Sequence, residues 1–382
     1  MRTVLTADPA TVPWPDTPDG DVARRWLTPM LRDGTEAFVA NAAVELRVLV
    51  VGAGAEAVAL PVTVSQPDPA LAYPASPVQH YLAYAAEEAP KISRAAGWAA
   101  RATLVPAAAA LRLTAFDRCV FVNNWLLSTN LWPALDEAHV AAAAEALRRA
   151  FPGRAIVFKT VDRASAPALH ATCQALGARL VPSRQTWTLD PHDVGLGRLK
   201  NVRRDARRLA ETPYRIRRGE TLNDAEVARV GALYRMLYLD KYVGLNPDLS
   251  DRFLAHAARD GLLAVRAFER DGRIDAALGY FVRDGVMTQP VFGYDTALPR
   301  ELGLYRLLAA QVLAEARAQP GLRLLNRSAG AGRFKALRGA TPGTEVHAVF
   351  DAHLPARQRA VWEALRRLCV GAVFPAMRRL EL

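Results

Sequence analysis

The sequence has few cysteines, and their spacing gives no sign of a shared structural role. Cys119, Cys173 and Cys369 are scattered, and no two of them form a CxxC pair. Neither a disulfide framework nor a zinc site is therefore indicated. The chain also lacks a run of about 18 uncharged apolar residues, so we expect no membrane span. Its N-terminal segment meets aspartates and prolines before any apolar stretch of about 7–15 residues, which argues against a secretory signal. We therefore expect a cytoplasmic enzyme of bacterial type, without bound metal.

Two common phosphate-binding motifs are absent from the glycine-rich segment LLNRSAGAGRFKALRGATPG, residues 324–343. The P-loop spelling GxxxxGK[ST] fails because Arg333 and Phe334 follow Gly332. The dinucleotide fingerprint GxGxxG fails because Lys335 stands where its last glycine should be. The role of this loop has to be inferred from the residues around it.

The composition is that of an ordinary folded protein. Hydrophobic residues make up 51% of the 382 residues and charged residues 23%, which is enough for a large core. At about 100–200 residues a domain, the length predicts two or three domains.

The net charge of +11 is concentrated in one segment, residues 198–218. This segment holds nine cationic and two acidic residues, a local balance of +7. Such a block attracts an anionic partner: a nucleotide-bearing cofactor, tRNA or an acidic carrier protein. A solvated, arginine-rich helix face is the alternative. Four of the cations recur at i, i+3, i+4 and i+7 and would share one helix face, namely Lys200, Arg203, Arg204 and Arg207.

Each half of the chain follows a similar order of predicted elements. In the first half a hairpin with a glycine turn is followed by a long alanine-rich, proline-dotted region and then by strand, helix, strand, short helix and strand. Its clearest elements are the hairpin strands 45–52 and 56–65, the strand 119–129 and the helix 136–151. The second half reads as a strand, two helices, a three-stranded meander with two Asp-Gly turns, a helix, a strand, a short helix and a strand. Its predicted elements are 214–222, 225–242, 251–261, 262–296, 300–319, 321–328, 331–339 and 344–354.

This order resembles the fold of the Gcn5-related N-acyltransferases (GNAT), and a tandem pair of such domains resembles the Fem family of aminoacyl transferases and related predicted N-acyltransferases. The resemblance implies an α/β (α+β) protein of two tandem GNAT-like domains, each a mixed, mostly antiparallel sheet flanked by helices. We expect a degenerate N-terminal domain over residues 1–192. Residues 193–382 would form the C-terminal domain, with the donor site and a C-terminal helix.

The resemblance places a donor site in the second half. GNAT proteins use a Q/R-x-x-G-x-G/A turn before a helix to hold the pyrophosphate of coenzyme A, and exposed amides at a helix N-terminus suit a diphosphate. Here the matching turn supplies Arg300 and Gly303, although Tyr305 replaces the second small residue. In the first half, Asp136 and Glu137 begin the equivalent helix and would repel a diphosphate, so that half would instead shape an acceptor cleft. The expected donor-binding residues are Arg300, Gly303, Leu304, Tyr305 and Phe334.

The pair Phe334-Lys335 resembles the Phe-Lys pair after the fifth strand of the second Fem domain. In that family the lysine stabilises the transition state of acyl transfer. Attack on an ester or thioester builds negative charge on oxygen, and a fixed donor lowers that barrier by about 3–4 kcal/mol. Lys335 is therefore predicted to be catalytic, the alternative being a surface lysine beside a glycine loop. Many GNAT enzymes also carry N-x-x-A-x-x-x-Y here; Asn326 and Ala329 match its start, but no tyrosine follows.

Other candidates come from their positions along the predicted strands. Glu345 and His347, at period two on the last strand, are candidate general bases, and so is Asp295. Substrate contacts are expected from Gln289, Tyr280, Tyr294, Asn326 and Tyr242. The segment 241–250 between two helices would cover the acceptor, with Tyr238, Lys241, Tyr242 and Asn246 as lid residues.

These observations predict an N-acyltransferase that moves an acyl group from an acyl-CoA thioester to the amine of a small molecule or amino acid. One alternative is a Fem-like transferase that takes its acyl group from aminoacyl-tRNA or an acyl carrier protein. Another is a non-catalytic protein whose basic segment binds nucleic acid. The chain is expected to be a monomer or homodimer. Its amphipathic tail would dock on the body, dimerise or lie on an anionic membrane.

Overall fold

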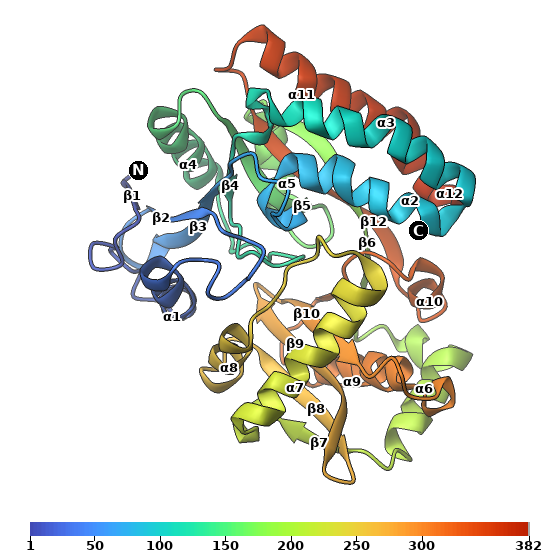
Figure 1. Cartoon of the computed structure of the whole chain (residues 1–382). Helices are drawn as coiled ribbons and strands as arrows, with labels where there is room; N and C mark the ends of the chain where they lie inside the picture. The colour runs from blue at the N-terminus through green and yellow to red at the C-terminus, as the bar shows by residue number, and fades with distance from the viewer. Residues whose placement is uncertain (381–382) are drawn as a thin grey trace. The chain divides into compact units, whose positions relative to one another are not determined.

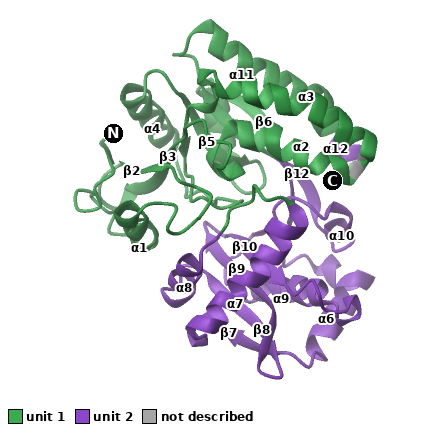
Figure 2. Cartoon of the chain, in the orientation of Figure 1, with its two compact units in different colours: residues 1–183, 243–248, 345–376 green, residues 184–242, 249–344, 377–382 purple. Residues whose placement is uncertain are grey.

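The structure is a computed structural model that describes residues 1–380, and it divides into two compact units (Figures 1 and 2). Two strands, β6 (Arg179–Leu189) and β12 (Thr341–Phe350), begin in one unit and end in the other. Unit 1 consists of residues 1–183, 243–248 and 345–376, and unit 2 of residues 184–242, 249–344 and those from 377.

Unit 1 is built on a mixed sheet in the order β1-β2-β3-β4-β5-β12-β6, in which β4 and β5 are parallel and the other recorded pairs antiparallel. Its strands before β6 are β1 (Thr3–Thr6), β2 (Glu45–Val51), β3 (Val58–Val64), β4 (Cys119–Val122) and β5 (Ala155–Asp162). Its helices are α1 (Pro18–Asp33), α2 (Tyr84–Ile92), α3 (Arg94–Arg112), α4 (Glu137–Ala150), α5 (Pro167–Ala175) and α11 (Ala356–Leu368). Helix α11 is followed by the π-helical turn η9 (Cys369–Val373) and by α12 (Phe374–Leu380). The last residues of α12 belong to unit 2.

Helices cover both faces of the unit 1 sheet because the strands are apolar on both sides. In β5, Ile156 and Phe158 pack toward α4 and α5, whereas Ala155 and Val157 pack toward α3 and α11. This is the period-two alternation of a strand buried on both faces.

The strands of unit 2 pair in the order β6-β11-β10-β9-β8-β7, in which only β10 and β11 are parallel among the recorded pairs. Its remaining strands are β7 (Arg215–Arg218), β8 (Ala264–Arg270), β9 (Arg273–Arg283), β10 (Val286–Tyr294) and β11 (Leu324–Asn326). Its helices are α6 (Lys200–Ala210), α7 (Asp224–Arg235), α8 (Asp251–Arg259), α9 (Leu304–Ala318) and α10 (Gly332–Ala336), with the π-helical turn η7 (Met236–Tyr242) directly after α7.

The two faces of the unit 2 sheet carry different helices (Figure 1). Helix α9 buries Leu307, Leu308 and Val312 against one face, and α7 packs on β9 and β10 from the other. Close approach of α7 requires Gly293, since a Cβ there would lie 2.5 Å from the carbonyl of Leu233. Strands β10 and β11 pair only over Val286–Thr288, and the β9–β10 register shifts at that point, so the end of β10 separates from β11.

The architecture confirms the predicted fold class: two units in tandem, each a mixed, mostly antiparallel sheet flanked by helices. The compact units differ from the predicted division at residues 192 and 193 in one main respect. Residues 345–376 belong to unit 1, because β12 pairs with β5 and Trp362 of α11 packs against Phe116. The predicted strand 119–129 ends at Val122, where the backbone turns at Asn123 (φ 58°).

Candidate active site

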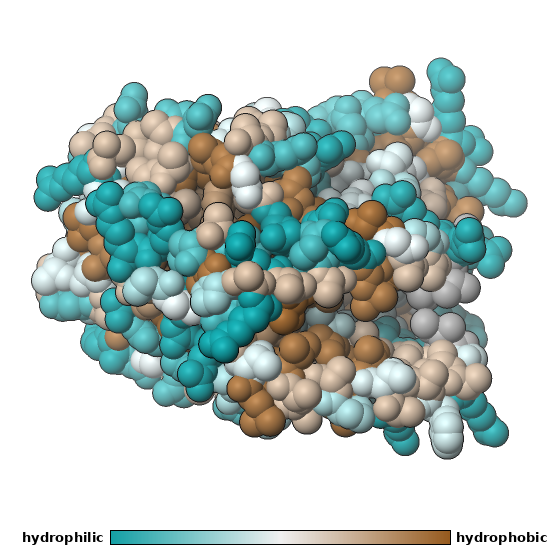
Figure 3. Space-filling model, turned by 90° about the horizontal axis from the view of Figure 1, so that it is seen from above, coloured by the Kyte–Doolittle hydropathy of each residue, from teal (hydrophilic) through white to brown (hydrophobic). Residues whose placement is uncertain are grey.

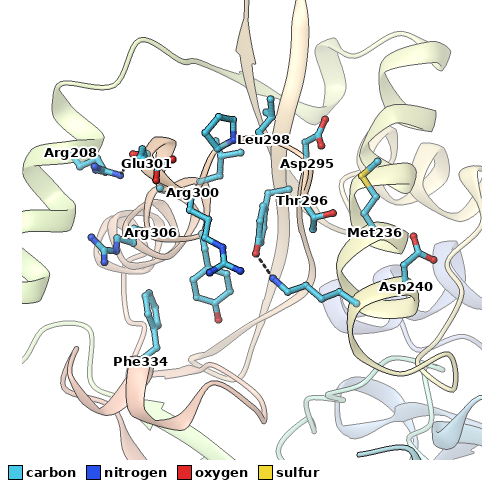
Figure 4. Close-up of a pocket in the computed structure, with 16 residues that line it drawn as sticks. Arg208, Met236, Asp240, Asp295, Thr296, Leu298, Arg300, Glu301, Arg306 and Phe334 are labelled. Carbon is cyan, nitrogen blue, oxygen red and sulfur yellow. Dashed lines mark hydrogen bonds between the residues drawn. The ribbon is translucent and has the colours of Figure 1, made fainter. Parts of the chain in front are cut away.

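The candidate active site is a cavity of about 780 Å³ within unit 2, at the N-terminus of α9. The end of β10, the loop 295–303 and the first turn of α9 form most of its wall, with additions from α6, η7 and α10. In Figure 4, Met236 and Asp240 of η7 lie on one side of the cavity, and Arg306 and Phe334 on the other. All five predicted donor-binding residues line it: Arg300, Gly303, Leu304, Tyr305 and Phe334.

Gly303 shapes the entrance of α9. It is the N-cap residue and has a left-handed conformation (φ 64°, ψ 34°), which glycine adopts without strain. A Cβ at this position would lie 1.8 Å from Nη1 of Arg208. The same Nη1 donates a hydrogen bond of 3.0 Å to the carbonyl oxygen of Glu301. The Arg208 guanidinium therefore lies directly over the helix N-terminus, where the first helical amides have no partner within the helix.

Arg208 comes from the basic segment that the sequence singled out. It was not among the four residues of the predicted helix face, so its place in the cavity was missed. The lining is mildly cationic: four cations face three acids. The cations are Arg208, Lys241, Arg300 and Arg306, and the acids are Asp240, Asp295 and Glu301.

Aromatic rings form one wall of the cavity. The Tyr305 ring meets that of Phe334 edge-on at 4.7 Å between centroids, and it also contacts Phe292 and Tyr294. Burial raises the pKa of the Tyr305 phenol, so it stays protonated at neutral pH. Tyr305 thus replaces the expected small residue without closing the cavity.

A buried ion pair holds this wall against α6. The Arg338 guanidinium stacks 3.4 Å above the centre of the Phe334 ring and donates from Nε to Oδ2 of Asp205, at 2.7 Å. Both charged side chains are more than nine-tenths buried. Asp205, one of the two acids in the basic segment, therefore joins α6 to the helix that carries Phe334.

The arrangement of Lys335 differs from the predicted one. Its side chain is buried, and Nζ donates to the carbonyl oxygens of Arg327 (2.6 Å), Ser328 (3.1 Å) and Ala329 (2.8 Å). An ammonium has three donors, so all three are used within this loop. Lys335 is not among the residues that line the cavity. Burial lowers the pKa of its amine well below the ordinary value, and nearby Arg327 and Arg184 lower it further.

The loop that Lys335 holds has an unusual backbone. Ser328, Gly330 and Ala331 all have positive φ, between 52° and 75°. Two of them are not glycine, and such residues rarely adopt this conformation unless the surroundings impose it. The three hydrogen bonds from Lys335 supply that constraint. They fix the start of α10 and therefore the position of Phe334.

The region that forms the cavity matches a known protein family. Residues 197–336 match the model of the acetyltransferase (GNAT) domain. The chain carries a GNAT domain. The match spans α6 to α10 and so includes every residue that lines the cavity. It supports an acyltransferase and leaves both substrates open. No curated protein sequence matches the chain.

One solved structure shares the fold over most of the chain. The crystal structure of FemX is similar over 92% of this chain and 98% of its own, with a TM-score of 0.52 and 10% identity, which shows a shared fold. Two further structures are similar at lower scores. A tandem GNAT protein from the clavulanic acid biosynthesis pathway has a TM-score of 0.41 and 16% identity, over 90% of this chain and 92% of its own. The C-terminal domain of a putative lysylphosphatidylglycerol synthetase from Agrobacterium fabrum has a TM-score of 0.43 and 17% identity, over 61% of this chain and 78% of its own.

Lys241 and Tyr294 bring two sides of the GNAT-domain cavity together. Nζ of Lys241, on η7, donates a hydrogen bond of 2.9 Å to the hydroxyl of Tyr294 at the end of β10. The sequence predicted Tyr294 as a substrate contact and Lys241 as a lid residue, and both line the cavity. Tyr242, the next lid candidate, is exposed and packs edge-on against Tyr238 without lining it.

Asp295 lines the cavity, but its environment does not suit a base that works near neutral pH. Its Oδ2 accepts a hydrogen bond of 2.7 Å from Arg229, and its Oδ1 accepts one from the amide of Ala297. Burial acts to raise the pKa of Asp295, but the hydrogen bonds from Arg229 and Ala297 outweigh it and lower the pKa. The carboxylate therefore stays ionised and paired.

The other two base candidates, Glu345 and His347, belong to unit 1 and do not line the GNAT-domain cavity. Both are buried on β12. Glu345 accepts a hydrogen bond of 3.0 Å from the hydroxyl of Ser183, and Nδ1 of His347 lies 3.0 Å from the hydroxyl of Tyr81. Their role as bases stays a prediction.

Besides Tyr242, three further predicted substrate contacts lie outside the cavity lining. Tyr280 is buried against α9, where its hydroxyl donates 2.5 Å to Glu315, and burial together with that bond raises its pKa to about 12. Asn326 uses Oδ1 to accept from the amide of Ser328, while Nδ2 has no partner among the described residues. Gln289 lies at the register shift of β10, and its Oε1 also has no hydrogen-bond partner among the described residues.

Two further searches were negative for the described part of the chain. Residues 1–380 contain no group of three or more histidine, cysteine, aspartate or glutamate side chains that could hold a metal ion. No helix of that range is both long and apolar enough to cross a bilayer.

Proposed function

We propose that the protein is an N-acyltransferase that takes an acyl group from an acyl-CoA thioester and joins it to the amine of a small molecule or amino acid. The observation that carries the proposal is the cavity at the N-terminus of α9 inside the matched GNAT domain. Helical amides, the left-handed Gly303 and the cation of Arg208 meet at one point there. This combination suits a diphosphate, the group that coenzyme A would place at that point.

In the proposed reaction the amine nitrogen attacks the thioester carbonyl carbon. A C–N bond forms, the C–S bond breaks, the attacking nitrogen loses a proton to solvent and the leaving thiolate gains one. The Tyr294 hydroxyl is the proton donor we assign to the thiolate, because it lines the cavity and accepts a hydrogen bond from the Lys241 ammonium. A cation next to a phenol stabilises the phenolate that proton transfer would leave.

Replacing Tyr294 by phenylalanine tests this assignment. Tyr294→Phe keeps the ring contact with Tyr305 but removes the proton donor, so kcat should fall about 100-fold with little change in KM for acyl-CoA. The matched control is Tyr280→Phe, whose hydroxyl bonds Glu315 outside the cavity, and it should keep kcat. Steady-state kinetics of both variants measures this difference in kcat. Equal kcat in wild type and Tyr294→Phe would remove the hydroxyl from the mechanism.

The donor itself is tested by thermal shift with acetyl-CoA, longer acyl-CoAs and total tRNA. A ligand at a hundred times its Kd stabilises the folded protein by about 2.7 kcal/mol, so an acyl-CoA should raise the melting temperature by several degrees. Arg208→Ala should weaken that response because it removes a cation at the α9 N-terminus. Arg203→Ala removes an exposed cation from the same helix without touching the cavity, and it should respond like wild type.

The alternative donor, aminoacyl-tRNA or an acyl carrier protein, is favoured by one observation. Arg203, Arg204 and Arg207 are exposed on α6, the helix that also delivers Arg208 to the cavity. A polyanionic carrier would use all of them. In that case tRNA or carrier protein would stabilise the chain, with strong salt dependence and sensitivity to Arg203→Ala, and acyl-CoA would have no effect. Salt-sensitive tRNA binding without any transferase activity would instead support a nucleic-acid-binding protein.

A further inference from the structure

The outer side of α3 in unit 1 is apolar although it is exposed. Trp98 is 79% exposed, Val105 53% and Leu113, directly after the helix, 91%. Spacings of seven and eight residues place them on one side of a helix. The opposite side of α3 is already buried, at Gly97, Ala100 and Ala108. Helix α3 is therefore packed on one side and still presents an apolar stripe on the other, which a helix facing only water does not need.

A second group of exposed apolar residues lies at the end of α11. Leu368 is 55% exposed, Val370 50% and Val373 38%, the last two in the turn η9. Helices α3 and α11 pack on the same core cluster of unit 1, where Leu111 and Leu365 both contribute. Figure 3 views the molecule from above the helices at the top of Figure 1, and brown apolar residues lie among long hydrophilic side chains on this face.

The charge of these helices indicates what kind of surface they fit. Residues 94–113 and 356–373 together hold seven arginines and one acid, a balance of +6. That acid, Glu363, is paired with Arg179, Arg366 and Arg367, so it offers little negative charge to a partner. A second copy of this chain docked here through a two-fold axis would place one surface of net charge +6 opposite another of the same charge. An apolar stripe with tryptophan, flanked by arginines, instead matches the interface of an anionic bilayer.

We propose that the face formed by α3 and α11–η9 docks on the surface of an anionic lipid bilayer, with Trp98, Val105 and Leu113 inserted at the headgroup boundary. Burial of these side chains would supply the apolar part of the binding. The arginines would supply attraction to anionic headgroups. The proposal concerns unit 1 alone, so it does not depend on the donor or acceptor of the GNAT domain.

Vesicle sedimentation of the full-length protein tests the proposal. Vesicles of phosphatidylglycerol and phosphatidylcholine in equal amounts should bind the wild type, and vesicles of phosphatidylcholine alone should bind it much more weakly. The double variant Trp98→Glu/Leu113→Glu should partition at least about tenfold less, because charged groups replace the inserted side chains. Val194→Glu is the matched control: Val194 is 84% exposed but lies in unit 2, so the variant should bind like wild type.

The charge contribution has its own variant. Arg94→Gln/Arg101→Gln removes two exposed cations from α3, and partition to the anionic vesicles should fall about 25-fold at low salt, at roughly fivefold for each arginine. Partition to neutral vesicles should not change. Three outcomes would overturn the proposal: no sedimentation of the wild type with anionic vesicles, wild-type binding by the double glutamate variant, or concentration-dependent self-association that the same substitutions abolish without any binding to vesicles.

Discussion

Replacing Gly303 by alanine should weaken acyl-CoA binding at least about tenfold while the protein remains folded. The added Cβ would lie 1.8 Å from Nη1 of Arg208, so this guanidinium must leave its place over the α9 N-terminus. Alanine is also strained at a φ of 64°. Both effects disturb the point where we place the diphosphate, and a loss of about 1.4 kcal/mol in binding corresponds to the tenfold change. Isothermal titration with acetyl-CoA measures it.

Gly321→Ala separates the binding effect from backbone strain. Gly321 has a φ of 70°, yet a Cβ there would meet no atom within 4 Å, and the residue lies outside the cavity lining. Both variants should lose stability by about 1 kcal/mol, since both force alanine into the same backbone region. Only Gly303→Ala should lose affinity for acetyl-CoA. If the two variants bind equally well, the cavity at α9 is not the donor site.

Replacing Lys335 by methionine should destabilise the protein by about 2–4 kcal/mol. The substitution removes three hydrogen bonds at once and leaves the carbonyls of residues 327–329 without their donor; of these residues Arg327 is buried, Ser328 half-buried and Ala329 exposed. Phe334 lies in α10, which follows this loop, and it lines the cavity. KM for the donor should therefore rise together with the loss of stability. Thermal or chemical denaturation measures the first effect and steady-state kinetics the second.

The result also distinguishes two roles for this lysine. A lysine that contacts the reacting carbonyl would lose about 100–1,000-fold in kcat without a change in melting temperature. A positioning lysine, which the three carbonyl contacts indicate, changes stability and KM first. Arg333→Met is the matched control, since it removes an exposed cation from the same short helix and should change neither. A drop in kcat alone for Lys335→Met would restore the catalytic role predicted from the Phe-Lys pair.

The turn that precedes α9 could be predicted from sequence because its physical basis is local. The positive φ at the start of the helix favours glycine because of the local backbone conformation, and this preference does not depend on contacts with the rest of the chain. The three-stranded meander β8–β10 was predictable for the same reason, since the Asp271-Gly272 and Asp284-Gly285 turns specify it locally. The five residues that line the cavity, in contrast, were predicted from the resemblance to the GNAT turn and to the Fem Phe-Lys pair, and their role in donor binding stays a prediction.

Other features depended on contacts that short-range signals do not encode. The Phe-Lys pair predicted an important lysine, but only the fold of residues 327–331 determines that its amine faces three carbonyls. Arg208 was overlooked because its neighbours Arg203, Arg204 and Arg207 match a helix face better, although they face solvent. Helix α3 received no prediction because its alanines lack a hydrophobic period and Pro106 lies inside it.

Strand β12 has a consequence for how the protein can be divided. Thr341–Thr344 lie in unit 2, and from Glu345 the same strand completes the unit 1 sheet beside β5. A fragment ending near residue 192 would leave the edge of β5 without its neighbour, and an unpaired edge invites aggregation. Because each unit is made of segments that are separated along the chain, neither unit can be isolated by a single cut.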